Sequence, residues 1–166
     1  MAIEIVPVGA DNVAEAGRVH ACAWQASHSA FCTPDFVALH SPARQTRYLR
    51  DKLAAGSLVF LLRLDGAAAG VVSVTGDLIE DLYILPRLQN RGLGTSLLRH
   101  AVRQCRGRPA LWILENNAGA ARFYRREGFE PTGRRNAVTD GLDEIEFALA
   151  GPAGARDGRG PSRGQS

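Results

Sequence analysis

The chain has 166 residues, of which 45% are hydrophobic and 22% are charged. This length suits one substantial core, and no apolar run approaches the roughly 20 residues that span a bilayer, so we expect one soluble domain without a membrane segment. The formal net charge is +3, but three arginines less one aspartate in residues 151–166 supply +2 of it. The remaining charge is too small to form a basic face, which argues against a nucleic-acid partner.

The two ends of the chain differ in composition from its middle. The N-terminal stretch lacks a basic segment and carries Glu4 among its apolar positions, unlike a secretory signal, so we expect a cytoplasmic protein. Residues 151–166 are rich in Gly, Pro, Ser and Arg and have no apolar anchor, which predicts a disordered tail after a domain over residues 1–150. The three cysteines form no CxxC pair, so no metal site is predicted.

A strand followed by a helix is expected at the start of the chain. The strand is predicted over residues 3–8, and the helix is predicted to run to about Trp24. The helix is expected to begin at a capping box, because Asn12 is followed three residues later by Glu15.

Two further helices and a hairpin are predicted next. Thr33-Pro34 and Ser41-Pro42 each place a capping hydroxyl before a proline at the first helical position. The runs over residues 58–64 and 67–75 resemble strands, and the Asp65-Gly66 pair between them is a two-residue hairpin signal.

Strands and helices alternate in the second half. A third strand is predicted over residues 80–85, and from Gly92 to about Cys105 the apolar positions recur at helical spacing. The remaining predicted elements are a strand over 110–114, a helix over 118–127 and a closing antiparallel pair over 129–135 and 142–149. This order indicates an α+β fold.

The segment between that third strand and the helix from Gly92 has the properties of an anion-binding loop. A helix N-terminus presents backbone N–H groups and the positive end of the helix dipole, and Gly92 and Gly94 let an oxyanion approach the backbone. Arg91 adds a charge and Thr95 a hydroxyl donor, so pyrophosphate is the expected ligand. The segment lacks the Lys-Ser/Thr of a P-loop and the third glycine of a dinucleotide fingerprint.

Two motifs resemble the GNAT superfamily of N-acetyltransferases. Residues 89–95, with the sequence QNRGLGT, are similar to its Q/R-x-x-G-x-G/A signature. Residues 113–129, with the sequence ILENNAGAARFYRREGF, are similar to its strand-Asn-x-x-Ala-x-x-Phe-Tyr block. The motifs occur in the family's order and separation, and the close resemblance covers about residues 58–149.

The resemblance implies the single-domain GNAT fold, which is α+β with a central, mostly antiparallel twisted sheet and flanking helices. In this fold the strand ending at Leu85 and the strand starting near Ala110 splay apart. Homodimers are frequent in the family, so a homodimer is one assembly that the resemblance allows.

The resemblance also implies acetyl-CoA as the acetyl donor, without a metal. Its pantetheine is expected against the backbone of Leu82, Tyr83 and Ile84, with Asn117 as a further contact. Its pyrophosphate is expected on seven consecutive residues, which we name the cradle: Gln89, Asn90, Arg91, Gly92, Leu93, Gly94 and Thr95.

Three residues beyond the first helical region are implied in catalysis or in the acceptor site. Tyr124 matches the family tyrosine that donates a proton to the CoA sulfur, and it also contacts the cofactor. Glu80 and Asp81 lie in a segment similar to that of diamine and polyamine acetyltransferases, where the glutamate deprotonates the amine. Because successive strand residues point to opposite faces, we expect only one carboxylate to face the acetyl group. We assign Glu80 as the base and Asp81 to the substrate.

The implied function is transfer of an acetyl group from acetyl-CoA by direct attack in a ternary complex. The acceptor is expected to be a primary amine of a small molecule, a polyamine-like compound or a peptide N-terminus. The first helical region supplies the acceptor surface in this family, through Trp24, His28 and Phe31 here. The alternative is a non-catalytic acetyl-CoA-binding or sensing module, but the presence of Tyr124 favours an enzyme.

Overall fold

A computed structural model describes residues 2–30 and 32–151 of the chain. Contacts divide the chain into two compact units, Met1–Trp112 and Ile113–Ser166. The prediction of a single domain over residues 1–150 stays a prediction. The predicted tail over 151–166 lies outside the described residues, apart from Gly151.

The Met1–Trp112 unit is built on an antiparallel run of strands that follow one another in space as in sequence. The order is β1-β2-β3-β4-β5, and the first three pairings are antiparallel. Strand β5 instead pairs in parallel with β4, through Leu78 and Ala110. The strands are β1 (Ile3–Pro7), β2 (Leu58–Leu64), β3 (Ala67–Thr75), β4 (Leu78–Ile84) and β5 (Ala110–Leu114), of which the last two residues fall in the second unit.

The parallel pairing of β4 with β5 is confined to one end of the strands. Within the described residues their ladder holds the single pair Leu78 and Ala110, supported by the bond from Ala110 N to Asp77 O at 2.9 Å. The mostly antiparallel sheet and this short parallel contact confirm the predicted α+β class.

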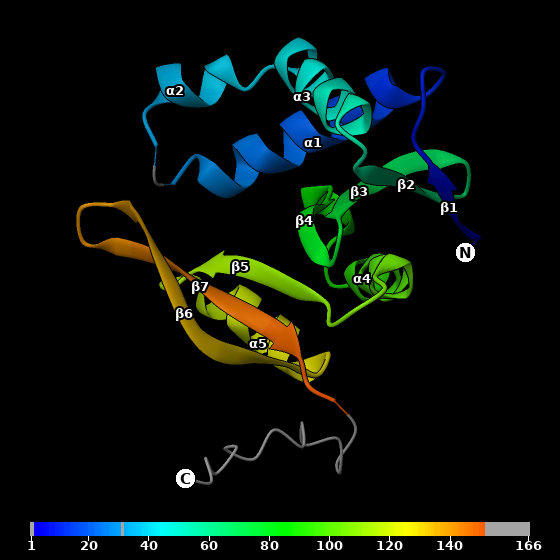
Figure 1. Ribbon diagram of the computed structural model, residues 1–166. Helices are drawn as coiled ribbons and strands as arrows, with labels where there is room; N and C mark the ends of the chain where they lie inside the picture. Colours follow the sequence, from blue (N-terminus) through cyan, green and yellow to red (C-terminus); the bar gives the residue numbers. More distant parts are fainter. Residues whose placement is uncertain (1, 31, 152–166) are drawn as a thin grey trace, which may run out of the picture. The chain divides into compact units, whose positions relative to one another are not determined.

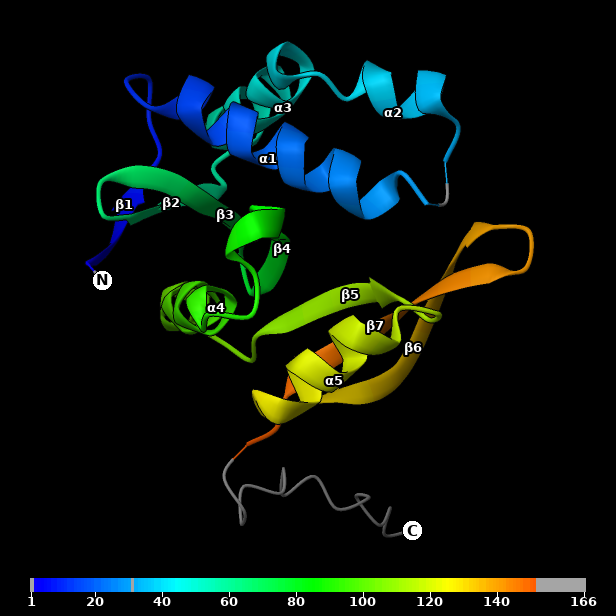
Figure 2. The ribbon, with the colours of Figure 1, turned by 180° about the vertical axis from the view of Figure 1, so that it is seen from behind.

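Helices cover both faces of these strands. Figure 1 shows α1, α2 and α3 on one face and α4 on the other, and the reverse view in Figure 2 agrees. The helices are α1 (Val13–His28), α2 (Pro34–Leu39), α3 (Pro42–Ala54) and α4 (Leu93–Gln104), with a short 3₁₀ helix η1 (Pro86–Leu88) before α4. The core between α1, α3 and the strands is aliphatic, and its fully buried members include Ala16, Leu49, Leu61 and Val71. None of the described helices is long and apolar enough to cross a membrane.

The Ile113–Ser166 unit contains one helix and a long hairpin, α5 (Ala118–Arg126), β6 (Phe129–Thr139) and β7 (Leu142–Leu149). Strands β6 and β7 are antiparallel, and Phe129 and Phe147 are buried at their inner ends. Every residue of β6 after Phe129 is exposed. The hairpin is therefore anchored at one end and solvated over most of β6.

The predicted proline-led helix starts are confirmed. Thr33 Oγ1 accepts a bond from Phe36 N, and Ser41 Oγ accepts one from Arg44 N.

The predicted capping box at Asn12 and Glu15 is wrong. Asn12 Oδ1 accepts from Gly9 N at 2.8 Å, upstream of the helix, and makes no cap bond. Glu15 instead pairs with Arg63 of β2 at 3.0 Å. Helix α1 also extends four residues beyond Trp24, to His28.

Gly17 of α1 allows the close approach of α3, because it has no side chain at the contact. A Cβ there would lie 1.9 Å from Thr46 Oγ1 and 2.8 Å from Thr46 Cα. We predict that Gly17→Ala lowers the free energy of unfolding by about 2 kcal/mol, because overpacking outweighs the roughly 1 kcal/mol by which Ala favours a helix over Gly. Urea unfolding measures this change.

The matched control is Gly119→Ala in α5. The nearest atoms to a Cβ at Gly119 lie 3.9 Å away, so this change should leave stability equal or higher. Equal stability of the Gly17→Ala protein and the wild type would contradict the close packing of α1 on α3.

Candidate functional site

The cradle lies where the backbone turns from β4 into α4. Gly92 is the N-cap of α4 with φ of +80°, and Asn90 has φ of +61°. Glycine adopts this left-handed conformation without steric cost, whereas other residues are strained in it. The turn leads directly into α4, and the N-terminus of a helix attracts anions.

The space beside the cradle backbone is open. A Cβ built on Gly92 would meet no heavy atom within 4 Å. Gln89, Asn90 and Arg91 are exposed, although Gln89 Nε2 donates back to Ile84 O at 3.2 Å. Leu93 is 1% exposed, so its side chain belongs to the core and does not line the open space. The geometry fits a pyrophosphate held mainly by the backbone.

Glu80 and Asp81 of β4 both contact one ammonium, that of Lys52 from α3. Lys52 Nζ lies 3.1 Å from Glu80 Oε1 and 2.8 Å from Asp81 Oδ2. The expectation that neighbouring strand residues point to opposite faces is therefore wrong here. Asp81 has φ of +56°, and the pairing of β3 with β4 shifts register between Val71 and Ser73. This bulge turns Asp81 toward the side of Glu80.

Asp81 is the centre of a hydrogen-bonded network. Besides Lys52, its carboxylate accepts from Ser73 Oγ at 2.7 Å, Tyr48 OH at 3.0 Å and His20 Nε2 at 3.1 Å. Gln45 Nε2 donates to His20 Nδ1 at 2.9 Å. Both ring nitrogens of His20 therefore have a hydrogen-bond partner.

The network shifts the pKa values of its members. Burial alone would raise the pKa of Asp81, but the hydrogen bond from His20 and the charge of Lys52 hold it well below its usual range. Burial alone would lower the pKa of Lys52, but its bond to Asp81 raises it above its usual range. Burial and the charge of Asp81 raise the pKa of Tyr48 to about 12. Asp81 and Lys52 are therefore both charged at neutral pH.

The partners of Asp81 are not predicted by the sequence alone. The sequence carried one signal for His20, which recurs with Val13, Ala16 and Val19 on the apolar stripe of α1. A histidine at such a position needs a buried partner. The identity of that partner, 61 residues away, follows from no spacing rule.

Trp24 does not offer its ring faces to an acceptor. His28 and His40 stack on it with centroid distances of 4.0 Å and 3.5 Å and near-parallel planes. Each imidazole donates from Nδ1 to a carbonyl of its own helix, that of Trp24 for His28 and that of Phe36 for His40. The predicted acceptor residues Trp24 and His28 therefore belong to a stacked cluster with His40. Phe31 lies outside the described residues.

The predicted residues of the second unit lie on α5. Asn117 Oδ1 caps the helix by accepting from Ala120 N at 3.1 Å. The Tyr124 ring packs against Phe123 and Phe129, at centroid distances of 5.0 Å and 5.9 Å. Burial raises the pKa of Tyr124 above its usual range, so the phenol keeps its proton at neutral pH.

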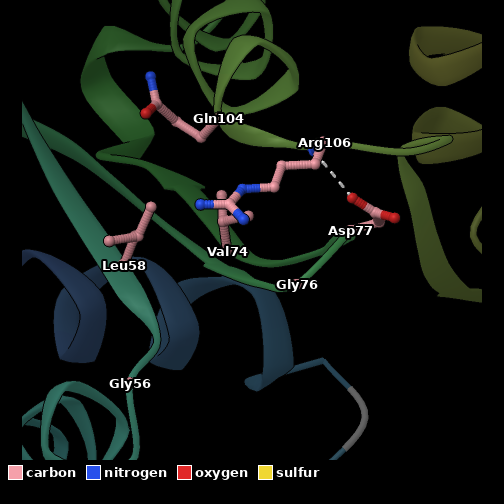
Figure 3. Close-up of a pocket in the computed structure, with 7 residues that line it drawn as sticks. All are labelled: Gly56, Leu58, Val74, Gly76, Asp77, Gln104 and Arg106. Atoms are coloured by element: carbon pink, nitrogen blue, oxygen red, sulfur yellow. Dashed lines mark hydrogen bonds between the residues drawn. The ribbon is translucent and has the colours of Figure 1, made fainter.

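One pocket of about 500 Å³ lies away from the predicted site residues (Figure 3). It lies where β4 begins and α4 ends, whereas the cradle lies where β4 ends and α4 begins. Asp77 Oδ1 accepts from Arg106 N at its rim. No predicted cofactor or catalytic residue lines it, so we do not assign it to the reaction. No group of three His, Cys, Asp or Glu side chains among the described residues is arranged to hold a metal ion.

The sequence is similar to those of known acetyltransferases. The acetyltransferase (GNAT) family matches residues 24–129, more than half of the chain. The peptidyl-lysine N-acetyltransferase YjaB of Salmonella typhimurium is 28% identical over 120 residues, which are 72% of this chain and 81% of that protein. The streptothricin acetyltransferase of Streptomyces lavendulae is 36% identical over 96 residues, and the chain spans 51% of its length.

Solved structures share the fold. The PaiA N-acetyltransferase of Thermoplasma acidophilum, solved with coenzyme A, has a TM-score of 0.69 at 18% identity over 89% of this chain and 98% of that one. YjaB of Escherichia coli, solved without ligand, has a TM-score of 0.64 at 21% identity over 92% of this chain and 100% of that one. These likenesses confirm the predicted fold.

The Asp81 network predicts an acid-dependent stability. We predict that Asp81→Asn lowers the free energy of unfolding at pH 7 by about 3 kcal/mol, because it leaves Lys52 without its nearest carboxylate. The folded pKa of Asp81 is lowered, so its contribution is fully present above the unfolded pKa of about 3.9 and is lost as pH falls toward the folded pKa. The difference between wild type and variant should be constant above about pH 5 and shrink below it.

Urea unfolding from pH 8 to pH 3 checks this course. Asp143→Asn is the control, because Asp143 pairs with the exposed side chain of Arg135 and its loss should cost less than about 1 kcal/mol. A difference between wild type and Asp81→Asn that stays unchanged down to pH 3 would exclude the ion pair as its cause.

Proposed function

Because the chain belongs to the acetyltransferase (GNAT) family and is an N-acetyltransferase with acetyl-CoA as donor, we propose a direct mechanism. In it the acetyl group passes from acetyl-CoA to a primary amine within a ternary complex. The acceptor class is a small molecule, a polyamine-like compound or a peptide. The observation that carries the proposal is the cradle, where left-handed Gly92 opens α4 beside unfilled space.

The cradle residues would hold the pyrophosphate of acetyl-CoA. Backbone N–H groups at the start of α4 supply directed donors, and the exposed Arg91 supplies a charge. The pantetheine would lie along the backbone of Leu82, Tyr83 and Ile84, with amide groups of the ligand paired to those of the strand, as in strand addition. Acetyl-CoA supplies the activated thioester, and these residues would orient it.

Acetyl transfer needs a base for the attacking amine and an acid for the departing thiolate. Glu80 is the proposed base, since its side chain is 37% exposed and reachable by water or an amine. Asp81 is unsuited to this role. Its four hydrogen-bond donors and its lowered pKa oppose protonation, so it would not take a proton from the amine. Tyr124 is the proposed acid, since burial keeps a proton on its phenol.

Two relatives guide the choice of acceptor. One is named a peptidyl-lysine N-acetyltransferase and the other a streptothricin acetyltransferase. A lysine side chain ends in a primary amine, which is the group that Glu80 would deprotonate. We therefore favour primary amines over other nucleophiles in the screen that would identify the acceptor, namely thiol release from acetyl-CoA with mass spectrometry of the products.

We predict that acetyl-CoA and CoA each raise the melting temperature, since a ligand at a hundredfold excess over its dissociation constant adds roughly 2.7 kcal/mol to the stability. Gly94→Val should abolish this shift, because a branched side chain would occupy the place of the pyrophosphate. Gly9→Val, before α1, is the matched control and should keep the shift, since a Cβ there meets no atom within 4 Å. An undiminished shift in folded Gly94→Val protein would refute the cradle as the cofactor site.

We predict that Tyr124→Phe lowers kcat by about 10² to 10⁴, while the affinity for acetyl-CoA changes little, because the lost interaction grows only as thiolate charge develops. If Tyr124 serves only in packing with Phe123 and Phe129, kcat should be preserved and only the melting temperature should change. Measuring kcat, the dissociation constant and the melting temperature on one variant separates the two roles. A kcat within about twofold of wild type would contradict the role of Tyr124 as the acid. Such a change is far below tenfold, which itself corresponds to only about 1.36 kcal/mol of activation free energy.

A further inference from the structure

An ammonium-binding site lies between β3 and β4, and the chain fills it from within. Lys52 Nζ donates to Ser73 Oγ at 2.9 Å, Glu80 Oε1 at 3.1 Å and Asp81 Oδ2 at 2.8 Å. An ammonium has three N–H donors, so these three oxygens satisfy it completely. The side chain of Lys52 is 14% exposed, and Tyr48 lies beside its ammonium, 5.3 Å from the ring centroid.

The site has two carboxylates and one ammonium, so one negative charge is not balanced by Lys52. Glu80 and Asp81 bring two carboxylates to the site, and the ammonium of Lys52 pairs with both of them. Asp81 is 12% exposed and already accepts from four side chains, whereas Glu80 is more exposed. The residual negative charge is therefore presented to solvent by Glu80.

We propose that Lys52 is a specificity-determining residue, whose ammonium takes the place that a second ammonium of the acceptor would occupy beside Glu80 and Asp81. The acceptor class that fits is then an amine with a single positive charge near its reacting end. Diamines and polyamines with closely spaced charges are disfavoured. This inference rests on the proposed function, in which Glu80 faces the acceptor amine.

The physical reason is repulsion between like charges at short range. An acceptor ammonium near Glu80 lies within a few ångströms of Lys52, and one carboxylate charge remains to offset it. A second ammonium on the same acceptor would meet no uncompensated carboxylate. At the effective dielectric constant near a protein surface, such a contact changes affinity by about tenfold or more.

The first test concerns the ammonium site itself and needs no turnover. Lys52→Ala removes three methylenes and the ammonium, which n-propylammonium reproduces. At about 100 mM, n-propylammonium chloride should raise the melting temperature of this variant by about 3 °C more than sodium chloride does. Wild type, whose own ammonium already fills the site, should respond equally to the two salts. An equal response of Lys52→Ala to the two salts would overturn the proposal.

The second test concerns selectivity and uses amines of equal length. Thiol release is measured with 1-aminopentane and 1,5-diaminopentane for wild type, Lys52→Met and Lys52→Arg. The ratio of kcat/KM should favour the monoamine in wild type and in Lys52→Arg, which keeps the charge. In Lys52→Met it should shift toward the diamine by about tenfold or more. A ratio within twofold of wild type in folded Lys52→Met would also overturn the proposal.

The two tests separate this inference from the proposed function. If wild type binds acetyl-CoA but transfers its acetyl group to neither amine nor to any member of an amine library, the proposed function fails. The salt comparison on Lys52→Ala still decides whether the chain fills an ammonium site. If Lys52→Ala does not fold, the selectivity of Lys52→Met against Lys52→Arg decides it.

Discussion

The ammonium of Lys52 and the carboxylate of Asp81 lie 2.8 Å apart, and much of the Met1–Trp112 unit depends on this contact. Removing two charges from water costs several kcal/mol for each, unless hydrogen bonds satisfy what the pair leaves open. Here Ser73 and His20 supply such bonds to the carboxylate, and Glu80 accepts from the ammonium. These groups come from α1, α3, β3 and β4, so the ion pair is satisfied only while the four elements keep their arrangement. The same requirement offsets the cost of the left-handed backbone at Asp81.

The bulge at Asp81 links the proposed acceptor side of β4 to its proposed donor side. An extra residue in one strand shifts the pairing of all that follows, and side chains change face with each single step. After the bulge, Tyr83 and Ile84 pair with Val71 and Gly70. The backbone proposed to receive pantetheine therefore takes its register from a network that includes α1 and α3. We expect substitutions in that network to alter the binding of both the acceptor and acetyl-CoA.

The cradle is built in a different way, from consecutive residues. Gly92 adopts its left-handed conformation at the junction of η1 and α4. The helix that follows is amphipathic, and its buried residues Leu93 and Leu97 anchor it in the core. Tyr124 is similarly placed by neighbours close in sequence, Phe123 and Phe129. The residues proposed to act on the donor are thus placed by contacts close in sequence, whereas the carboxylates of β4 depend on contacts far along the chain.

The sequence by itself determined the α+β class, the proline-led starts of α2 and α3, and the glycine-led start of α4. These features follow from periodicity, caps and glycines, which act over a few residues. Tertiary structure alone decided that Glu80 and Asp81 share one ammonium, that His20 meets Asp81, and that the ring faces of Trp24 are covered. Strand alternation predicts opposite faces for neighbouring residues only while the ladder is regular. The bulge that breaks it is stabilised by a lysine 29 residues away, and no local pattern encodes such a contact.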